Sequence, residues 1–256
     1  MKRNPLYLRS GGLLGEIMPG ASPYFVCCLC SLLFGIEGPA AVVLSDNDFE
    51  ANEWSVTSRA GPNTQPMSAS GTQSVDGGNG GGYRLVSHTV TPAGSGFAYG
   101  WAWHLNTEQT HDPSSNPILS LGHLSEHRRF SSTTGEGATT YIVVQQDGNV
   151  YFSGANQVTI ALGWVSFSET GLTAMDFFRL KQDGSGTEAV HPNFSDTGSE
   201  LAFGVGFSNT PIGDGFSMSH GIDNWSVSLD VIPEASVICL AGLSVFGLAL
   251  RRRRTA

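Results

Sequence analysis

The middle of this 256-residue chain contains no cysteine: Cys27, Cys28 and Cys30 lie near its start and Cys239 near its end. A disulfide framework and a thiolate metal site are therefore excluded for residues 42–232. Charged residues make up only 14% of the chain, and the middle has no long segment with the period of an amphipathic helix. These absences argue against a helical bundle, whose surface needs many lysines and glutamates.

Basic residues are also scarce in the middle. Between Val42 and Ile232 the chain has six basic and nineteen acidic residues, a net charge of −13. An acidic surface repels phosphate backbones, so we expect no nucleic-acid partner. The same surface suits hydrated surroundings and divalent cations.

The middle of the chain instead shows short alternating segments separated by turn residues. Asp147-Gly148 and Asp183-Gly184 predict the turns of two β-hairpins. Further strands are expected over 96–105, 157–167, 201–208 and 220–231, and residues 69–82 are expected to form a loop. We therefore predict an all-β fold, with one antiparallel β-sandwich over residues 42–231. The apolar faces of 97–103 and 158–164 are expected to supply much of its core.

Aromatic residues suggest a second use of these strands. Sugar-binding sheets stack pyranose faces on exposed rings, and Tyr83, Tyr99 and Trp103 are the candidates for such contacts. The cores of ordinary β-sandwiches contain aromatic residues at a similar density, and core packing is the favoured interpretation for Trp101 and Trp164.

Catalytic motifs are almost absent. The segment "HLSEH", His123 to His127, matches the H-x-x-E-H pattern of inverted zinc peptidases. That chemistry needs both histidines on one helix, and no helix is expected here. A chance match in a polar loop is the favoured interpretation, and no other catalytic signature appears, so we expect no enzyme activity.

Acidic residues near both ends of the middle segment suggest a metal site. Asp46, Asp48 and Glu50 share one face if the segment is extended, and Asp223 lies in the last expected strand. The first and last strands of antiparallel sandwiches often pair, which would bring these carboxylates around a structural Ca²⁺. A solvated acidic turn is the alternative.

The same two segments carry a resemblance. The opening "DFE…W" and the closing "IDNWSV" resemble the ends of jelly-roll carbohydrate-binding modules and concanavalin A-like domains. The resemblance implies a jelly-roll sandwich, a calcium ion where the two ends meet, and polysaccharide as a partner. It covers about twenty residues at the edges of the domain and reaches Glu50 and Asp223.

The chain begins with a segment typical of secretion. An apolar run over 24–36 follows basic residues and precedes small ones, so residues 1–41 are expected to be a signal peptide that ends at Ala40 or Ala41. A buried core helix is the alternative.

The chain ends with a second apolar run over 235–250, followed by Arg251, Arg252, Arg253 and Arg254. Sixteen residues form a helix of about 24 Å, against about 30 Å for a bilayer core. One short transmembrane helix is therefore expected, with the arginines in the cytoplasm and the domain outside.

The segment 232–256 resembles the PEP-CTERM sorting tail of Gram-negative and related bacteria. The motif reads Pro233, Glu234 and Ala235, and lacks the second proline. The resemblance implies transient membrane insertion, cleavage by an exosortase-type protease, and release to the cell surface or an exopolysaccharide matrix. A permanent membrane anchor is the alternative.

Together these features predict a secreted, surface-sorted β-sandwich protein of the envelope or matrix, without enzyme activity and with polysaccharide as its expected ligand. Two alternatives stay open: a glycan-active enzyme on the same scaffold, and a structural surface protein anchored permanently in the membrane. A pair of carboxyl groups in a cleft would favour the enzyme.

Overall fold

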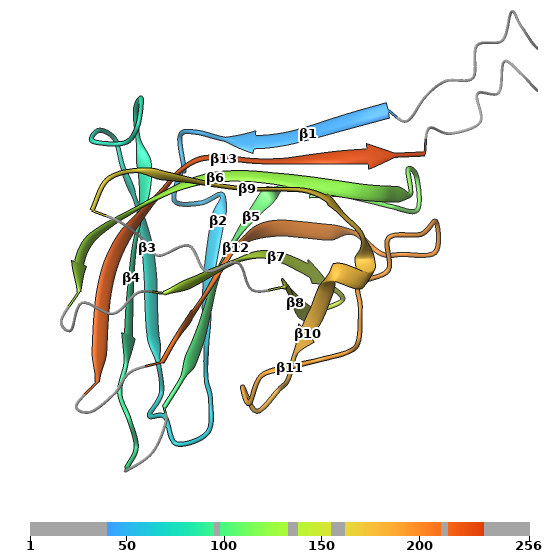
Figure 1. Ribbon diagram of the computed structural model, residues 1–256. Coiled ribbons are helices and arrows are strands. Elements are labelled where there is room, and N and C mark those ends of the chain that lie inside the picture. Colours follow the sequence, from blue (N-terminus) through green and yellow to red (C-terminus); the bar gives the residue numbers. More distant parts are fainter. Residues whose placement is uncertain (1–39, 95–97, 133–137, 155–161, 211–214, 233–256) are drawn as a thin grey trace, which may run out of the picture. The chain divides into compact units, whose positions relative to one another are not determined.

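The computed structural model describes residues 40–94, 98–132, 138–154, 162–210 and 215–232. They form two antiparallel sheets that share one apolar core (Figure 1), which confirms the predicted all-β sandwich. Within these ranges the helical structure is a short 3-10 turn, Ala174–Asp176 (η1), and no helix is long and apolar enough to cross a membrane. The expected signal helix and transmembrane helix lie outside the described residues.

The first sheet, called sheet A, has the order β3-β4-β13-β6-β9, with β1 also paired to β13. Its strands are β1 (Ala40–Asp46), β3 (Ser68–Ser74), β4 (Tyr83–Val90), β6 (Ile118–Ser132), β9 (Val165–Leu172) and β13 (Phe216–Val231). Strand β3 covers residues 69–74 of the segment 69–82, which the sequence predicts to be a loop. Strand β13 pairs with β4 along 216–222 and with β1 along 225–231, and its register shifts between Asp223 and Ser226.

The second sheet, called sheet B, has the order β11-β10-β8-β7-β12-β5-β2. Its strands are β2 (Trp54–Ala60), β5 (Gly100–His111), β7 (Thr139–Gln146), β8 (Asn149–Ser153), β10 (Phe177–Leu180), β11 (Thr187–Glu188) and β12 (Leu201–Asn209). Asp147 and Gly148 join β7 to β8 with φ angles of 51° and 73°, as expected for a two-residue hairpin turn.

The first and last strands pair as predicted. Ala40 lies opposite Val231 and Asp46 opposite Trp225 in an unbroken antiparallel ladder. Strand β1 begins two residues before the predicted start of the domain at residue 42. Strand β13 ends at residue 231, the predicted end of the domain. The start and the end of the sandwich therefore lie side by side (Figure 1).

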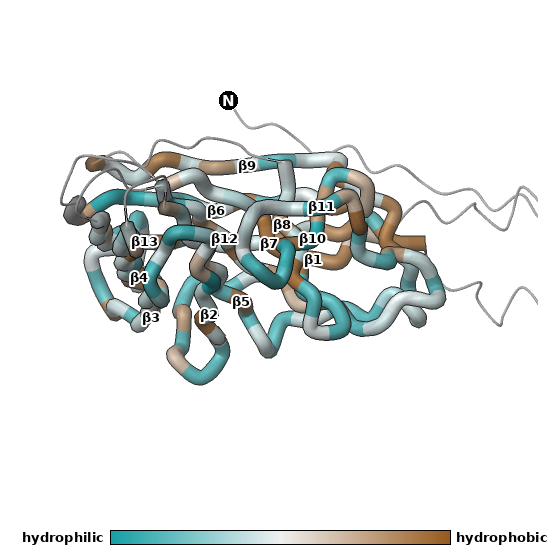
Figure 2. Tube along the Cα trace, turned by 90° about the horizontal axis from the view of Figure 1, so that it is seen from below, coloured by the Kyte–Doolittle hydropathy of each residue, from teal (hydrophilic) through white to brown (hydrophobic). Residues whose placement is uncertain are grey.

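The main core lies between the two sheets. Trp225, Val227 and Leu229 alternate along β13 and are fully buried, as the spacing of the last strand predicts. Sheet B contributes Phe203, Val205 and Phe207 from β12 to the same cluster. Figure 2 shows that the connections between strands are mostly hydrophilic.

One prediction about the core is wrong. Trp103 belongs to a second apolar cluster, with Leu105, Tyr141, Val143, Val150, Phe152 and Leu180, and Trp101 packs against that cluster. Its neighbours Ala102 and His104 point to the opposite side of β5, so the two tryptophans lie on the outer face of sheet B. Trp164 is half-buried and stands outside the core, and residues 157–161 of the strand expected over 157–167 lie outside the described residues.

Candidate functional site

Asp46 ends β1 with its side chain turned into the sandwich. Its Oδ1 accepts hydrogen bonds from the backbone N–H groups of Asp48 and Phe49, both at 2.8 Å. Its Oδ2 accepts from the indole Nε1 of Trp54 and, at 3.2 Å, from the amide Nδ2 of Asn106. Four donors therefore saturate this carboxylate and fix the turn that follows β1.

The structure does not bring together the four carboxylates that were predicted to hold calcium. The chain leaves the extended conformation after Asp46, with Phe49 at φ 55°, so Asp48 and Glu50 are exposed in a turn rather than aligned on a strand. Asp223 lies beyond the bulge of β13 and points to the outer face of sheet A, opposite to Asp46. Among the described residues, no three or more His, Cys, Asp or Glu side chains are grouped to hold a metal ion.

Asp223 instead anchors the glycine-rich turn 75–82 to the outer face of sheet A. It accepts hydrogen bonds from the backbone N–H groups of Asn79, at 2.5 Å, and Asn224, at 2.7 Å. The turn covers the carboxyl so closely that a Cβ on Gly78 would lie 2.6 Å from its Oδ2. Only 2% of Asp223 is exposed, and this burial raises the pKa of its carboxyl.

Glu126 lies directly opposite Asp223 on β6 and orients two amides. Its Oε2 accepts from Asn79 Nδ2 at 2.7 Å and from Asn224 Nδ2 at 2.8 Å, and its Oε1 accepts from Ser166 Oγ at 3.2 Å. Burial opposes ionisation of Glu126, but these hydrogen bonds outweigh it and lower the pKa of the carboxyl.

Three aromatic rings meet on the same face, next to this polar group. Tyr83 comes from β4, Phe130 from β6 and Trp164 from the approach to β9; we call them the outer-face cluster. Ring centroids are 5.3 Å apart for Tyr83 and Phe130, and 5.6 Å apart for Tyr83 and Trp164. The rings converge over Gly221 of β13, where a Cβ would lie 2.6 Å from Trp164 and 2.9 Å from Tyr83. The rings therefore lie directly against the backbone of β13, because Gly221 has no side chain between the backbone and the rings.

The outer-face cluster stays accessible to solvent. Phe130 has 37% of its surface exposed, and Tyr83 and Trp164 are half-buried. The guanidinium of Arg128 lies 5.2 Å from the ring centroid of Phe130 and donates to the carbonyl of Leu162 at 3.0 Å. An apolar surface with hydrogen-bonding groups beside it is thus presented to solvent by sheet A.

Of the three candidate sugar-binding residues, the structure brings Tyr83 alone to this face. Tyr99 and Trp103 lie with sheet B, under the turn 181–186. Tyr99 donates its hydroxyl to the carbonyl of Ser185, and Trp103 is only 3% exposed beneath the guanidinium of Arg59, 5.5 Å away. A ring that is covered on this scale cannot stack on a sugar, so the assignment of Trp103 is wrong.

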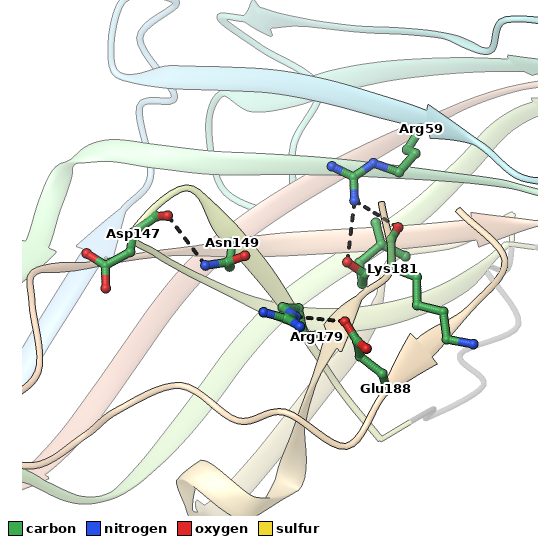
Figure 3. A network of polar contacts seen from close by, with 7 residues as sticks. Arg59, Asp147, Asn149, Arg179, Lys181 and Glu188 are labelled. Atoms are coloured by element: carbon green, nitrogen blue, oxygen red, sulfur yellow. Dashed lines mark hydrogen bonds and ion pairs between the residues drawn. The ribbon is translucent and has the colours of Figure 1, made fainter. Parts of the chain in front are cut away.

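Side chains hold the turn 181–186 in place over sheet B (Figure 3). Arg59 donates to the carbonyl of Lys181 at 3.0 Å, and Arg179 forms an ion pair of 2.8 Å with Glu188 at its base. Trp101 Nε1 donates to the carbonyl of Gly184 at 3.1 Å. The outer face of sheet B is therefore closed along this turn.

The motif "HLSEH" lies on a strand, which excludes the zinc-peptidase arrangement and also the polar loop that was favoured. His123 and His127 point into the sandwich from β6 and are buried, whereas Glu126 points outward. Both histidines pack against Phe167, with ring centroids 5.4 and 6.2 Å away.

Three more buried histidines lie between the sheets, and the sequence did not reveal them. His88 comes from β4, His104 from β5 and His220 from β13, and all three have no exposed surface. Burial lowers the pKa of His88, His123 and His127 to about 3 and that of His104 and His220 well below its ordinary value. The five rings, here called the interior histidines, are therefore neutral at physiological pH.

No protein-family model and no curated protein matches this chain. Similar solved structures include one described as "CBM4 structure and function", with 14% identity and a TM-score of 0.31, covering 73% of this chain and 94% of that chain. A carbohydrate-binding module studied for mannan recognition is 11% identical, with a TM-score of 0.33 over 74% of this chain and 98% of that one. Another, in complex with beta-1,4-galactotriose, is 9% identical, with a TM-score of 0.25 over 72% and 98%. Such TM-scores assign neither a family nor a ligand to this chain.

Proposed function

We propose that this protein is a non-enzymatic carbohydrate-binding β-sandwich that is secreted and sorted to the cell surface or an exopolysaccharide matrix. The observation that carries the binding proposal is the outer-face cluster of Tyr83, Phe130 and Trp164, placed beside the amides of Asn79 and Asn224 on sheet A.

This combination suits a sugar for two reasons. The C–H faces of a pyranose ring are apolar and pack against aromatic rings, whereas its hydroxyl groups need donors and acceptors at the edge of the contact. Glu126 holds the amides of Asn79 and Asn224 in fixed orientations, so less side-chain freedom is lost on binding.

The paired carboxylates of this face do not favour the enzyme. Glu126 and Asp223 lie opposite each other and their pKa values are shifted in opposite directions, a pattern that glycosidases also show. Asp223, however, is covered by the turn 75–82 and both its oxygens accept backbone hydrogen bonds. A carboxyl that fastens a turn cannot reach a glycosidic oxygen, so we assign this pair to the support of the binding face.

The sorting proposal is supported by the end of the chain. Strand β13 ends at Val231, and Ile232 is held by a hydrogen bond from its N–H to the carbonyl of Pro117 at 2.9 Å. The motif Pro233-Glu234-Ala235 follows at once, ahead of the apolar run and the four arginines. An exosortase-type protease that cuts there would release the complete sandwich, because every strand of the described residues precedes the motif.

A glycan array probed with the secreted protein tests the binding proposal. Retention of one or more polysaccharides, with loss of retention in Trp164→Ala, supports it. A protein that is folded by circular dichroism and binds no glycan on a broad array would instead be a structural surface protein.

A further inference from the structure

The strands of sheet A that present the outer-face cluster carry four of the five interior histidines on their other side; His104 faces them from sheet B. Along β13, Gly221 faces outward beneath the aromatic rings and His220 faces inward. Along β6, Glu126 and Arg128 face outward and His127 between them faces inward. Because side chains alternate along a strand, the interior histidines and the outer-face cluster are attached to the same backbone. A displacement of the strands at the histidines therefore also displaces the binding face.

The interior histidines form one connected cluster. His88 and His104 share a hydrogen bond between their Nε2 atoms at 3.2 Å, and the ring of His220 lies 5.2 Å from that of His88. The ring of Phe207 in sheet B packs against those of His220 and His127, with ring centroids 4.3 and 5.9 Å apart. His123 lies four residues before His127 on β6, and both rings pack against Phe167.

No acidic side chain among the described residues forms a hydrogen bond or an ion pair with these rings. Arg84, buried in the same region, is itself a cation and donates from Nε to His104 Nδ1 at 3.3 Å. Burial lowers the pKa values of Arg84 and His127. The charge of Asp46 partly offsets this for Arg84, and the charge of Glu126, on the opposite face of the sheet, partly offsets it for His127. Both ring nitrogens of His123 and of His220, and Nδ1 of His88 and His127, have no hydrogen-bond partner among the described residues.

We propose that this cluster makes carbohydrate binding at the outer face of sheet A reversible by acid: protonation of the interior histidines opens the sandwich and releases the ligand. The release rests on the proposed function, whereas the acid-driven opening does not. Buried neutral histidines bind protons only when the sandwich opens, so the open state takes up more protons than the folded one. Stability is therefore present above the ordinary histidine pKa and is lost as pH falls below it.

The direct test measures proton uptake. Urea unfolding of the full-length chain in detergent micelles, followed by tryptophan fluorescence from pH 8 to pH 4, gives the number of protons taken up from the slope of stability against pH. We expect about five protons near pH 5, one for each interior histidine. An uptake of fewer than two, or a sandwich that stays folded at pH 4, would overturn the proposal.

Variants show whether the cluster is the source. His220→Leu removes a ring with two unpartnered nitrogens and should lower the proton uptake by about one, whatever its effect on stability at pH 8. His123→Leu serves the same purpose if His220→Leu does not fold. His191→Gln, at a half-buried site whose Nδ1 contacts the carbonyl of Phe177, is the control and should leave the uptake unchanged. An unchanged uptake in both leucine variants contradicts the proposal.

The release is tested with insoluble mannan, galactan and cellulose as probes. Protein bound at pH 8 should elute as the pH is lowered through the unfolding transition. Retention below that transition would overturn acid release. Absence of binding to every polysaccharide at pH 8, combined with an uptake of about five protons, would remove the proposed function and the release together and leave only the acid-driven opening.

Discussion

His88 in sheet A and His104 in sheet B are joined across the interior by a hydrogen bond between their Nε2 atoms, 3.2 Å apart. Arg84 Nε, which can only donate, points at His104 Nδ1, so this nitrogen must be an acceptor. His104 is then the Nε2–H tautomer, and it donates to His88, which must be the Nδ1–H tautomer.

This assignment gives a first prediction. Nitrogen-15 NMR of the imidazole rings at pH 8 should show opposite tautomers for His88 and His104, both neutral. The Arg84→Leu variant removes the donor to His104 and frees its Nδ1 to carry the proton, so the two tautomers should no longer be fixed. Finding both rings as Nε2–H in the wild-type protein would contradict the geometry.

A second prediction concerns Asp46, which accepts four hydrogen bonds at the end of β1. Asp46→Ala leaves the indole N–H of Trp54 and the amide of Asn106 buried without their acceptor. We expect the free energy of unfolding to fall by about 3 kcal/mol or more, measured in urea. Asp48→Ala, at an exposed position of the same turn, is the control and should change it by about 0.5 kcal/mol or less. Equal losses in the two variants would show that the Asp46 contacts are not structural.

A third prediction concerns Gly221, where the rings of the outer-face cluster rest on bare backbone. Gly221→Val places a side chain where Trp164 and Tyr83 now lie, so the rings must move outward. Glycan binding should be lost and the fluorescence of Trp164 should change, while most of the fold remains. Gly163→Ala, next to Trp164 in the chain but with open space where the new Cβ would lie, is the matched control and should bind normally. Normal binding by Gly221→Val would place the site elsewhere.

A fourth prediction concerns the tail. Because β13 ends two residues before Pro233, cleavage at the motif leaves the sandwich complete. Mass spectrometry of protein from the cell surface of the native host should find a C-terminus near Pro233 and no terminal arginines. An intact Ala256 in the bulk of the mature protein would instead identify a permanent membrane anchor.

Local pattern was sufficient for much of the fold. Two-residue alternation and the Asp147-Gly148 turn identified strands and a hairpin, and the spacing of Trp225, Val227 and Leu229 identified a buried face. Alternation favoured the face of β5 with Trp101, Trp103 and Leu105 as the core face, because the other face carries Ala102, His104 and Asn106. Trp101 and Trp103 were therefore assigned to the wrong side.

The sites depended on tertiary structure. Tyr83 and Phe130 come from β4 and β6, and Trp164 directly precedes β9. They meet only because β4, β13, β6 and β9 are neighbours in sheet A. The position of His88 between Val86 and Val90, both buried on the same face, is a local signal that could have revealed an inward histidine. The predicted alignment of Asp46, Asp48 and Glu50 on one strand face does not occur because the chain turns directly after Asp46, which periodicity does not show.

The central claim is that sheet A binds carbohydrate through the outer-face cluster. The most direct measurement is the affinity of one array-selected glycan for the wild-type protein, Trp164→Ala and Tyr99→Phe, by titration calorimetry at pH 8. Loss of an aromatic contact at the centre of a site costs more than about 1.4 kcal/mol, so Trp164→Ala should bind at least about tenfold more weakly. Tyr99→Phe, under the closed turn of sheet B, should bind as the wild type does. Unchanged affinity in Trp164→Ala, or a loss confined to Tyr99→Phe, would contradict the claim.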